Sequence, residues 1–137
     1  MEGRRFLKLL LDTHIWIWTL LHPEKVGRTV RRHIENRRDE LFLSPISVWE
    51  AQQIERRKRL RLKQSFAEWL PQALAQVPVR EAPFTFAVAT AASRFELPQP
   101  DPVDTFLAAT ALVYDLTLVT ADTQLLDCAW LKTMPNE

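Results

Sequence analysis

The sequence predicts an α/β fold with a mostly parallel, five-stranded sheet that helices cover on both faces. Short apolar runs alternate along the chain with longer segments of helical periodicity, which is the pattern of βαβ units. Such units cross over right-handedly and produce a sheet that is buried on both faces. The 137 residues, 47% hydrophobic and 26% charged, fit one globular domain over residues 1–137.

Five apolar runs are the predicted strands. The first is Phe6–Leu11, which Asp12 ends and which we expect to be buried on both faces. The other four are residues 41–43, Val77–Arg80, Leu116–Thr120 and Leu131–Met134.

The predicted helices carry apolar residues at spacings of three and four. Their stripes run from Val26 to Ile34, Phe66 to Val77, Phe84 to Phe95 and Val103 to Val113. Pro71 falls within the second stripe and predicts a kink or a restart there. A short apolar helix after Asp12 carries Trp16 and Trp18, which we expect in the core or at a dimer interface rather than as base-stacking platforms.

Composition excludes several classes of protein. The chain has no run of about 18 apolar residues, so we expect no transmembrane helix, and its N-terminal apolar run is too short for a signal peptide. Cys128 is the only cysteine, so no internal disulfide forms and we expect a cytoplasmic protein. The two glycines supply neither a phosphate-binding loop nor a nucleophile elbow, and no His or Cys pair has zinc-ligand spacing.

Charge is uneven along the chain, although the net charge is only +1. Residues 1–63 carry 15 Lys or Arg against 8 Asp or Glu, and residues 64–137 carry 3 against 9. Six basic residues fall within eight positions: Arg56, Arg57, Lys58, Arg59, Arg61 and Lys63. We interpret them as an RNA-binding run that continues the helix carrying Glu50. The alternative is a solvated helix end whose cations suit the helix dipole.

Four acids lie where predicted strands end or helices begin. Asp12 follows the first strand and Asp122 the fourth, while Glu50 lies one turn into a helix and Asp104 opens another. Ligands of parallel sheets collect at this carboxyl edge. No Lys or Arg lies within three residues of any of the four, so their mutual repulsion would raise their pKa values unless a cation joined them. A hard divalent cation meets that need and can activate water beside a phosphate.

Helix capping is the structural alternative for each acid. Ser47–Glu50 matches a capping box, Asp101–Asp104 has residues favoured at a helix start, and Asp12 and Asp122 each precede a helix. Capping does not explain why all four are acidic, since Ser, Thr or Asn would cap as well. Capping and metal binding are also compatible, because a carboxylate has a second oxygen.

Four stretches, in order over most of the chain, resemble the motifs of PIN-domain nucleases, specifically the VapC-type toxins of prokaryotic toxin–antitoxin pairs. They are Leu9–His14, Ser47–Glu50, Asp104–Ala111 and Leu118–Asp122. The resemblance implies a Rossmann-like three-layer α/β/α sandwich and endoribonuclease activity that depends on Mg²⁺ or Mn²⁺. It also implies a homodimer, and a small antitoxin that inserts a basic or aromatic side chain near the acids.

The resemblance assigns roles to particular residues. Its catalytic and metal-binding residues are Asp12, Glu50, Asp104 and Asp122. Near the metal site it implies the hydroxyls of Thr13 and Thr120, and we add the Asp101 carboxylate. Two segments depart from the family pattern: Gln52–Ile54 lacks a Lys that many members have, and Leu97–Thr105 lacks a His and an Arg. These departures leave the acids intact and bear on substrate choice.

Three other functions stay open at this point. A receiver-like phosphoacceptor domain needs an acidic pair after the first strand and a Lys after the last, whereas Thr13 follows Asp12 and the only late lysine is Lys132. A catalytically silent binding module is the second. An RNA-processing PIN nuclease that is not a toxin is the third, although such enzymes usually carry extra domains.

Overall fold

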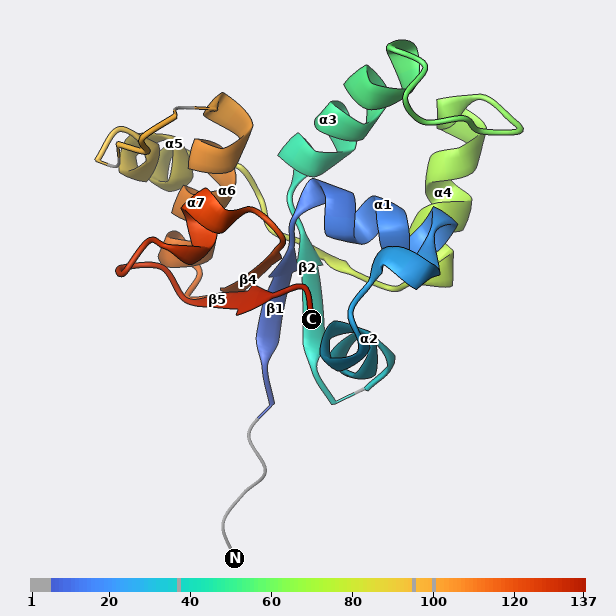
Figure 1. The fold of residues 1–137 in the computed structure, drawn as a ribbon. Coiled ribbons are helices and arrows are strands. Elements are labelled where there is room, and N and C mark those ends of the chain that lie inside the picture. Colours follow the sequence, from blue (N-terminus) through green and yellow to red (C-terminus); the bar gives the residue numbers. More distant parts are fainter. Residues whose placement is uncertain (1–5, 37, 95, 100) are drawn as a thin grey trace, which may run out of the picture.

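Five parallel strands form the sheet of the computed structural model, which describes residues 6–36, 38–94, 96–99 and 101–137 (Figure 1). The strands lie in the order β3-β2-β1-β4-β5, and every neighbouring pair is parallel. Strand order therefore reverses between β1 and β4, and the carboxyl end of such a switch point is where parallel sheets bind ligands. The strands are Lys8–Leu11 (β1), Glu40–Leu43 (β2), Arg80–Glu81 (β3), Thr117–Thr120 (β4) and Thr133–Pro135 (β5).

Helices cover both faces of the sheet, which confirms the predicted α/β/α layers. Helices α1, α2 and α4 lie on one side and α5, α6 and α7 on the other, while α3 contacts both α1 and α6 (Figure 1). None of the helices in the described part of the chain combines the length and apolarity needed to cross a membrane. The helices are Thr13–Leu21 (α1), Arg28–Glu35 (α2), Pro45–Arg56 (α3), Phe66–Gln76 (α4), Phe86–Ala92 (α5), Pro102–Val113 (α6) and Thr123–Leu126 (α7), with a 3₁₀ turn at Pro23–Lys25.

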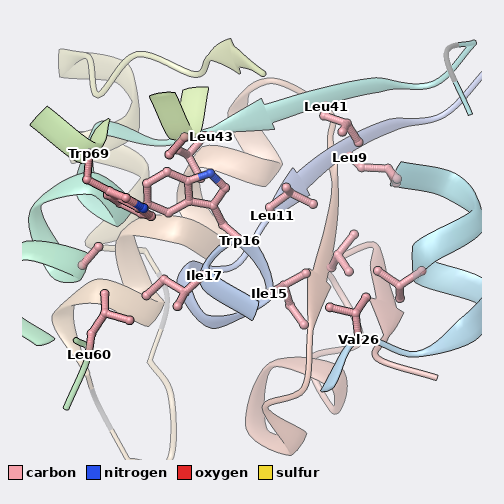
Figure 2. Close-up of a cluster of buried hydrophobic side chains, with 14 of the residues drawn as sticks. Leu9, Leu11, Ile15, Trp16, Ile17, Val26, Leu41, Leu43, Leu60 and Trp69 are labelled. Atoms are coloured by element: carbon pink, nitrogen blue, oxygen red, sulfur yellow. The ribbon is translucent and has the colours of Figure 1, made fainter. Parts of the chain in front are cut away.

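Strand β1 is buried on both faces, as its apolar run predicts. Leu9, Leu10 and Leu11 are each 0% exposed. Leu9 and Leu11 belong to a cluster in which the indole of Trp16 packs on that of Trp69, with ring centroids 5.6 Å apart (Figure 2). Leu10 faces a second cluster, under α6 and α7. Packing on both faces holds β1, and therefore the residue that follows it, in a fixed position.

All five predicted strands have different bounds in the structure: the second and fourth differ by one residue, and the fifth is Thr133–Pro135 and not Leu131–Met134. β1 begins at Lys8, and Phe6 before it is exposed. The third strand is Arg80–Glu81 and not Val77–Arg80, because Val77 and Val79 pack against the hydrophobic cluster under α4 while only the following two residues pair with β2. Hydrophobic residues there serve the core without joining the sheet.

The helices follow the predicted stripes with one correction. α4 runs through Pro71 without a break, so the predicted restart is wrong. Pro71 and Ala67 are both exposed, so the carbonyl of Ala67, which loses its N–H donor, is accessible to water. Phe95, which we placed in the third stripe, lies outside the described residues.

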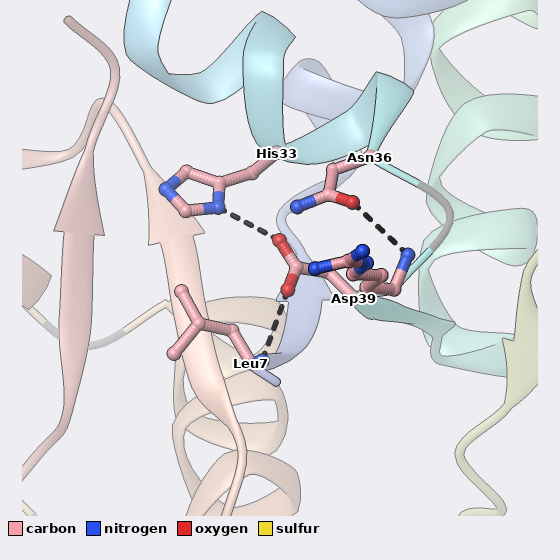
Figure 3. A network of polar contacts seen from close by, with 5 residues as sticks. Leu7, His33, Asn36 and Asp39 are labelled. Carbon is pink, nitrogen blue, oxygen red and sulfur yellow. Dashed lines mark hydrogen bonds and ion pairs between the residues drawn. The ribbon is translucent and has the colours of Figure 1, made fainter. Parts of the chain in front are cut away.

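A buried carboxylate ties the amino edge of the sheet together (Figure 3). The Asp39 side chain is 4% exposed, and its Oδ1 accepts a hydrogen bond from the backbone N–H of Leu7 at 3.0 Å. Its Oδ2 lies 2.8 Å from Nδ1 of His33, a residue of α2. Asp39 thus joins α2 to the segments that enter β1 and β2.

Candidate active site

The carboxyl edge of the sheet brings acids from four segments to one pocket of about 210 Å³. Asp12 follows β1 and Asp122 follows β4, while Glu50 and Asp104 come from α3 and α6. The pocket is lined by these four acids together with Asp101, His14, Ile15, Trp18 and Ala121. The residues that sequence analysis selected from distant parts of the chain therefore lie together.

Two of the acids cap the helices that follow them. Asp12 Oδ1 accepts a hydrogen bond from the N–H of Thr13 at 2.7 Å at the start of α1. Asp122 Oδ1 accepts one from the N–H of Gln124 at 2.8 Å at the start of α7. The capping alternative is therefore correct for both, and it fixes each carboxylate at the edge of the pocket.

The other two acids lie inside helices. Asp101 caps α6, which places Asp104 in the first turn of that helix, as its Pro-containing start predicts. The capping box predicted for α3 is wrong, because Ser44 and not Ser47 is the N-cap. Pro45 at the first helical position favours that earlier start. Glu50 consequently lies in the second turn, with no backbone donor to cap.

The Thr120 hydroxyl connects the acids at the ends of β1 and β4. It donates a hydrogen bond to Asp12 Oδ2 at 2.7 Å and accepts one from the backbone N–H of Asp122 at 3.0 Å. Thr120 is fully buried, so this link is shielded from competing water. It holds the Asp12 carboxylate in one orientation.

Two further hydroxyl groups, those of Thr13 and Ser47, lie near Glu50. Thr13 Oγ1 and Ser47 Oγ are hydrogen-bonded at 2.9 Å, and both residues are fully buried. The Thr13 hydroxyl also hydrogen-bonds the Glu50 carboxylate, which partly offsets the rise in its pKa. The start of α1 is therefore joined to α3 at the point where Glu50 enters the pocket.

Burial raises the pKa of both Asp12 and Glu50 above the ordinary range. The Asp12 charge further raises the pKa of Glu50, and hydrogen bonds from Thr120 and Thr13 oppose the rise at Asp12. The nearby imidazole of His14 also lowers both pKa values to some extent. Within the described ranges no Lys or Arg forms an ion pair with either carboxylate.

The third of these carboxyl groups, that of Asp104, has a pKa raised from 3.8 to about 8. Desolvation is the largest cause, followed by the charges of Asp12 and Asp101 and by the hydrogen bond and charge of Asp122. The neutral form of Asp104 is favoured because each of these neighbours is acidic. A pocket with this electrostatic character attracts cations.

The donor set fits a hard divalent cation. The four acids offer only carboxylate oxygens, which are the ligands that Mg²⁺ and Mn²⁺ prefer. No three Asp, Glu, His or Cys side chains of the described residues already converge on a single ligand position. Mg²⁺ nevertheless takes only one or two carboxylates directly and keeps several waters, so acids spread around a small pocket suit a hydrated ion.

A second hollow adjoins the acidic pocket. It has a volume of about 570 Å³, shares Asp101, Asp104 and Asp122 with the acidic pocket and continues toward α7. There Gln99 and Gln124 are joined by two hydrogen bonds, from Gln99 N at 2.6 Å and from Gln124 Nε2 at 3.1 Å. A chain-like substrate can therefore extend on both sides of the carboxylates.

The predicted basic run begins at the last residue of α3 and continues on a turn and loop, not on a helix. α3 ends at Arg56, and Lys58 has a positive φ of 58°, so the prediction that the run continues this helix is wrong. Leu60 is buried in the cluster of Trp69, which draws the chain back toward the core. The basic side chains themselves are exposed, and none of them lines the acidic pocket. They are Arg56, Arg57, Lys58, Arg59, Arg61 and Lys63.

Sequence reasoning missed three residues of the site. His14 and Trp18 line the pocket, and Ser47 supports Thr13 from beneath. Once Asp12 is taken as the cap of α1, His14 falls in its first turn and Trp18 lies one turn further on the same face. Trp16 is in the core as expected, but Trp18 is only partly buried.

Comparisons with known proteins bear on the family and on the fold. The model of the PIN domain family matches residues 9–131. The curated protein "Ribonuclease VapC22" of Mycobacterium tuberculosis (strain ATCC 25618 / H37Rv) is 31% identical over 118 residues, which are 85% of this chain and 88% of the relative.

Solved structures share the fold at lower identity. VapBC2 from Rickettsia felis, bound to a DNA fragment from their promoter, has a TM-score of 0.71 and 16% identity, over 96% of this chain and 100% of that one. FitAcB from Neisseria gonorrhoeae has a TM-score of 0.64 and 24% identity, over 93% of this chain and 97% of that one.

Proposed function

The chain belongs to the PIN-domain family, and we propose that it is a VapC-type ribonuclease, the toxin of a toxin–antitoxin pair. It hydrolyses phosphodiester bonds within RNA and depends on Mg²⁺ or Mn²⁺. The observation that carries this function is the acidic pocket, where carboxylates from four segments meet without a Lys or Arg partner among the described residues. The identity with a named ribonuclease supports the substrate class.

Asp12, Glu50, Asp104 and Asp122 would hold the metal. A cation bound there would activate a water molecule and neutralise the negative charge that develops on the phosphate. Thr120 orients Asp12, and Thr13 supports Glu50, so neither carboxylate has to reorganise when the site is filled. Asp101 contributes negative charge at the pocket mouth while it caps α6.

Asp104 would give up a proton when the site is filled. Its pKa of about 8 keeps it largely protonated at neutral pH in the absence of a cation. A divalent charge in the pocket favours the ionised form, so metal binding releases that proton. Metal affinity should therefore increase as pH rises toward 8.

The basic run after α3 would hold the RNA backbone. Its six exposed cations begin at Arg56, the last residue of the helix that carries Glu50, and the other five follow on the turn and loop beyond it. Replacing Arg57, Lys58 and Arg59 with Ala should weaken RNA binding and reduce its salt dependence by roughly one log unit per lost phosphate contact. An unchanged salt slope in filter-binding assays would mean that the run only solvates a turn.

The proposed protein partners are a small antitoxin and a second copy of the chain. A small antitoxin would place an Arg among the acids, because the planar guanidinium bridges two carboxylates. We propose that the chain forms a homodimer whose interface includes Phe86, which begins α5 and is 94% exposed. Both partners and the RNA substrate would be met in the cytoplasm. Phe86→Asp should shift the sedimentation coefficient to that of a monomer, and an unchanged value would place the interface elsewhere.

The site itself argues against one of the alternatives, and experiments test the other two. A receiver-like domain would bring a lysine to its acids, but Lys132 donates a hydrogen bond to Asp115 at 2.6 Å and does not line the acidic pocket. A catalytically silent binding module would not cleave RNA, so the cleavage assay described below tests this alternative. An RNA-processing nuclease that is not a toxin would cleave but would need no antitoxin.

Cleavage of RNA by the purified chain is the decisive experiment. The wild type should cleave RNA in Mg²⁺ or Mn²⁺ and stop when EDTA is added. Asp12→Asn should fold and fail to cleave, because a neutral amide is a poor ligand for a hard cation. Undiminished cleavage by Asp12→Asn, beside a mock-purified control, would contradict the assignment of the acids.

Competition between metal and antitoxin tests the toxin function. If an Arg of the antitoxin enters the acidic pocket, calorimetry should show antitoxin affinity falling as Mg²⁺ rises. KCl at equal ionic strength is the control for general screening. Equal affinities under the two conditions would place inhibition away from the acids.

A further inference from the structure

We propose that Trp18 stacks on a nucleobase next to the scissile phosphate, and that Lys25, which lies over the same ring, binds the backbone phosphate of that nucleotide. This subsite deepens the ribonuclease function proposed above and rests on it. Its ligand is a single-stranded stretch of RNA, because bases within a duplex are already stacked on one another.

Trp18 differs from its neighbour Trp16 in what surrounds it. Two residues along a helix turn the side chain by about 200°, so the two indoles leave α1 on different faces. Trp16 is fully buried and packs on Trp69. Trp18 is partly exposed and lines the same pocket as Asp12 and Glu50. The structure thus places a large aromatic surface directly beside the carboxylates.

Part of the Trp18 side chain packs against the hydrophobic cluster of Trp16, but its aromatic and cation–π contacts are with the exposed residues His14 and Lys25. Its ring centroid lies 5.8 Å from that of His14, at an interplanar angle of 55°, and Lys25 Nζ lies 5.7 Å from it. Lys25 is exposed, so the face of the indole that it covers can be reached from solvent. An exposed cation–π contact is weak, and a base can replace the ammonium group. Lys25 would then be free to meet the adjoining phosphate.

A stacking surface would help the acidic pocket to bind RNA, which is itself negatively charged. Four carboxylates repel the phosphates of RNA, and the basic run after α3 does not line their pocket. Stacking does not depend on charge, and every base offers a π face. An aromatic ring beside the acids therefore draws a strand into a pocket that would otherwise repel it. The cation of Lys25 adds attraction at the same place.

The test combines protein variants with RNA lesions. The substrate is a single-stranded oligonucleotide with one cleavage site, together with copies that carry one abasic nucleotide at each position around that site. The variants are Trp18→Leu, Trp18→Phe and Lys25→Ala. Trp130→Leu is the matched control, because Trp130 is 40% exposed and does not line the acidic pocket.

Trp18→Leu should raise KM about tenfold with little change in kcat, and Trp18→Phe should keep most of the affinity. Trp130→Leu should behave as the wild type. At one abasic position the wild type should itself lose affinity, and Trp18→Leu should add no further loss, because the missing base is the one that the indole contacts. Lys25→Ala should lower the salt dependence of KM by about one phosphate contact.

The outcomes distinguish this subsite from the function on which it rests. If the wild type cleaves but Trp18→Leu loses the same factor on every abasic substrate, Trp18 acts only through the shape of the pocket and the subsite is wrong. If Trp18→Leu does not fold, the wild type on the abasic series decides, because an equal loss of affinity at every abasic position contradicts a single stacked base. Absence of cleavage by the wild type in Mg²⁺ and Mn²⁺ overturns both the ribonuclease and the subsite.

Discussion

The two edges of the sheet treat their buried carboxylates in opposite ways. At the amino edge, Asp39 is surrounded by partners, since His33 and the N–H of Leu7 contact its two oxygens (Figure 3). At the carboxyl edge, Asp104 is surrounded by other acids, and its pKa is raised to about 8. A paired carboxylate stabilises the fold, whereas crowded carboxyl groups resist ionisation until a cation joins them. The difference separates structural acids from functional ones.

The largest expected effect concerns catalysis. Asp104→Asn should lower the rate of RNA cleavage by about 10²–10³-fold or more, because it removes a charge that would act on the metal beside the reacting phosphate. Asp39→Asn, at the other edge, should leave the rate near that of the wild type. Both are measured as kcat/KM in Mg²⁺ at a temperature where each variant is folded. Equal losses in the two variants would remove the contrast between the edges.

The second effect concerns stability and has the opposite pattern. Asp39→Ala leaves the N–H of Leu7 without its acceptor and His33 without its partner, which should cost about 2 kcal/mol of unfolding free energy. Asp104→Asn should not destabilise the metal-free protein, because it relieves repulsion from Asp12 and Asp101. Urea unfolding in EDTA measures both. A stability loss in Asp104→Asn as large as that in Asp39→Ala would make Asp104 a structural acid.

The position of two of the acids and the layers of the fold could be predicted from the sequence. Asp12 and Asp122 were placed correctly because parallel strands end at one edge, and a buried strand such as β1 is easily recognised from its apolar run. The arrangement of three layers followed for the same reason. These features depend on local pattern and on topology, which sequence periodicity reports directly.

The ends of α3 and the burial of Trp18 depend on tertiary contacts, which the spacing of apolar residues along the sequence does not reveal. Ser44 and Ser47 are both favourable N-cap residues. Ser44 is the N-cap of α3 because Pro45, which follows it, favours the first helical position. The helix after Glu50 ends at Arg56 because the buried Leu60 draws the chain inward. Trp18 was grouped with Trp16 because both have apolar neighbours, although only the helix face on which each lies decides its burial.

A smaller effect is expected from metal binding itself. Mg²⁺ at about ten times its dissociation constant should stabilise the wild type by about 1.4 kcal/mol, since it binds the folded state alone. Asp39→Asn should gain as much as the wild type, and Asp104→Asn should gain less. Thermal unfolding with and without Mg²⁺, at constant ionic strength, measures the gain. An equal gain in Asp104→Asn would mean that Mg²⁺ binds away from the acidic pocket.

The pH dependence of stability in metal-free buffer tests the crowding of the carboxyl edge directly. Folding raises the pKa of Asp104 from 3.8 to about 8, so the folded state holds this proton more tightly than the unfolded state. Its contribution to stability is complete below the unfolded pKa and is lost as pH rises through the folded value. Asp12 and Glu50 have pKa values raised in the same direction, so they add to the loss. The wild type should therefore lose stability between about pH 5 and about pH 9.

Asp104→Asn should lose less stability over that range, because its amide does not titrate. The two proteins should be most alike at low pH, where the Asp104 carboxyl is neutral too. Asp115→Asn is the matched control: Lys132 lowers the pKa of Asp115, so the stability that it contributes is lost only as pH falls below the unfolded value of 3.8. This control should keep the full wild-type slope above about pH 5. Parallel curves for the wild type and Asp104→Asn would show that Asp104 is ionised without cost, and the carboxyl edge would then be no more crowded than the amino edge.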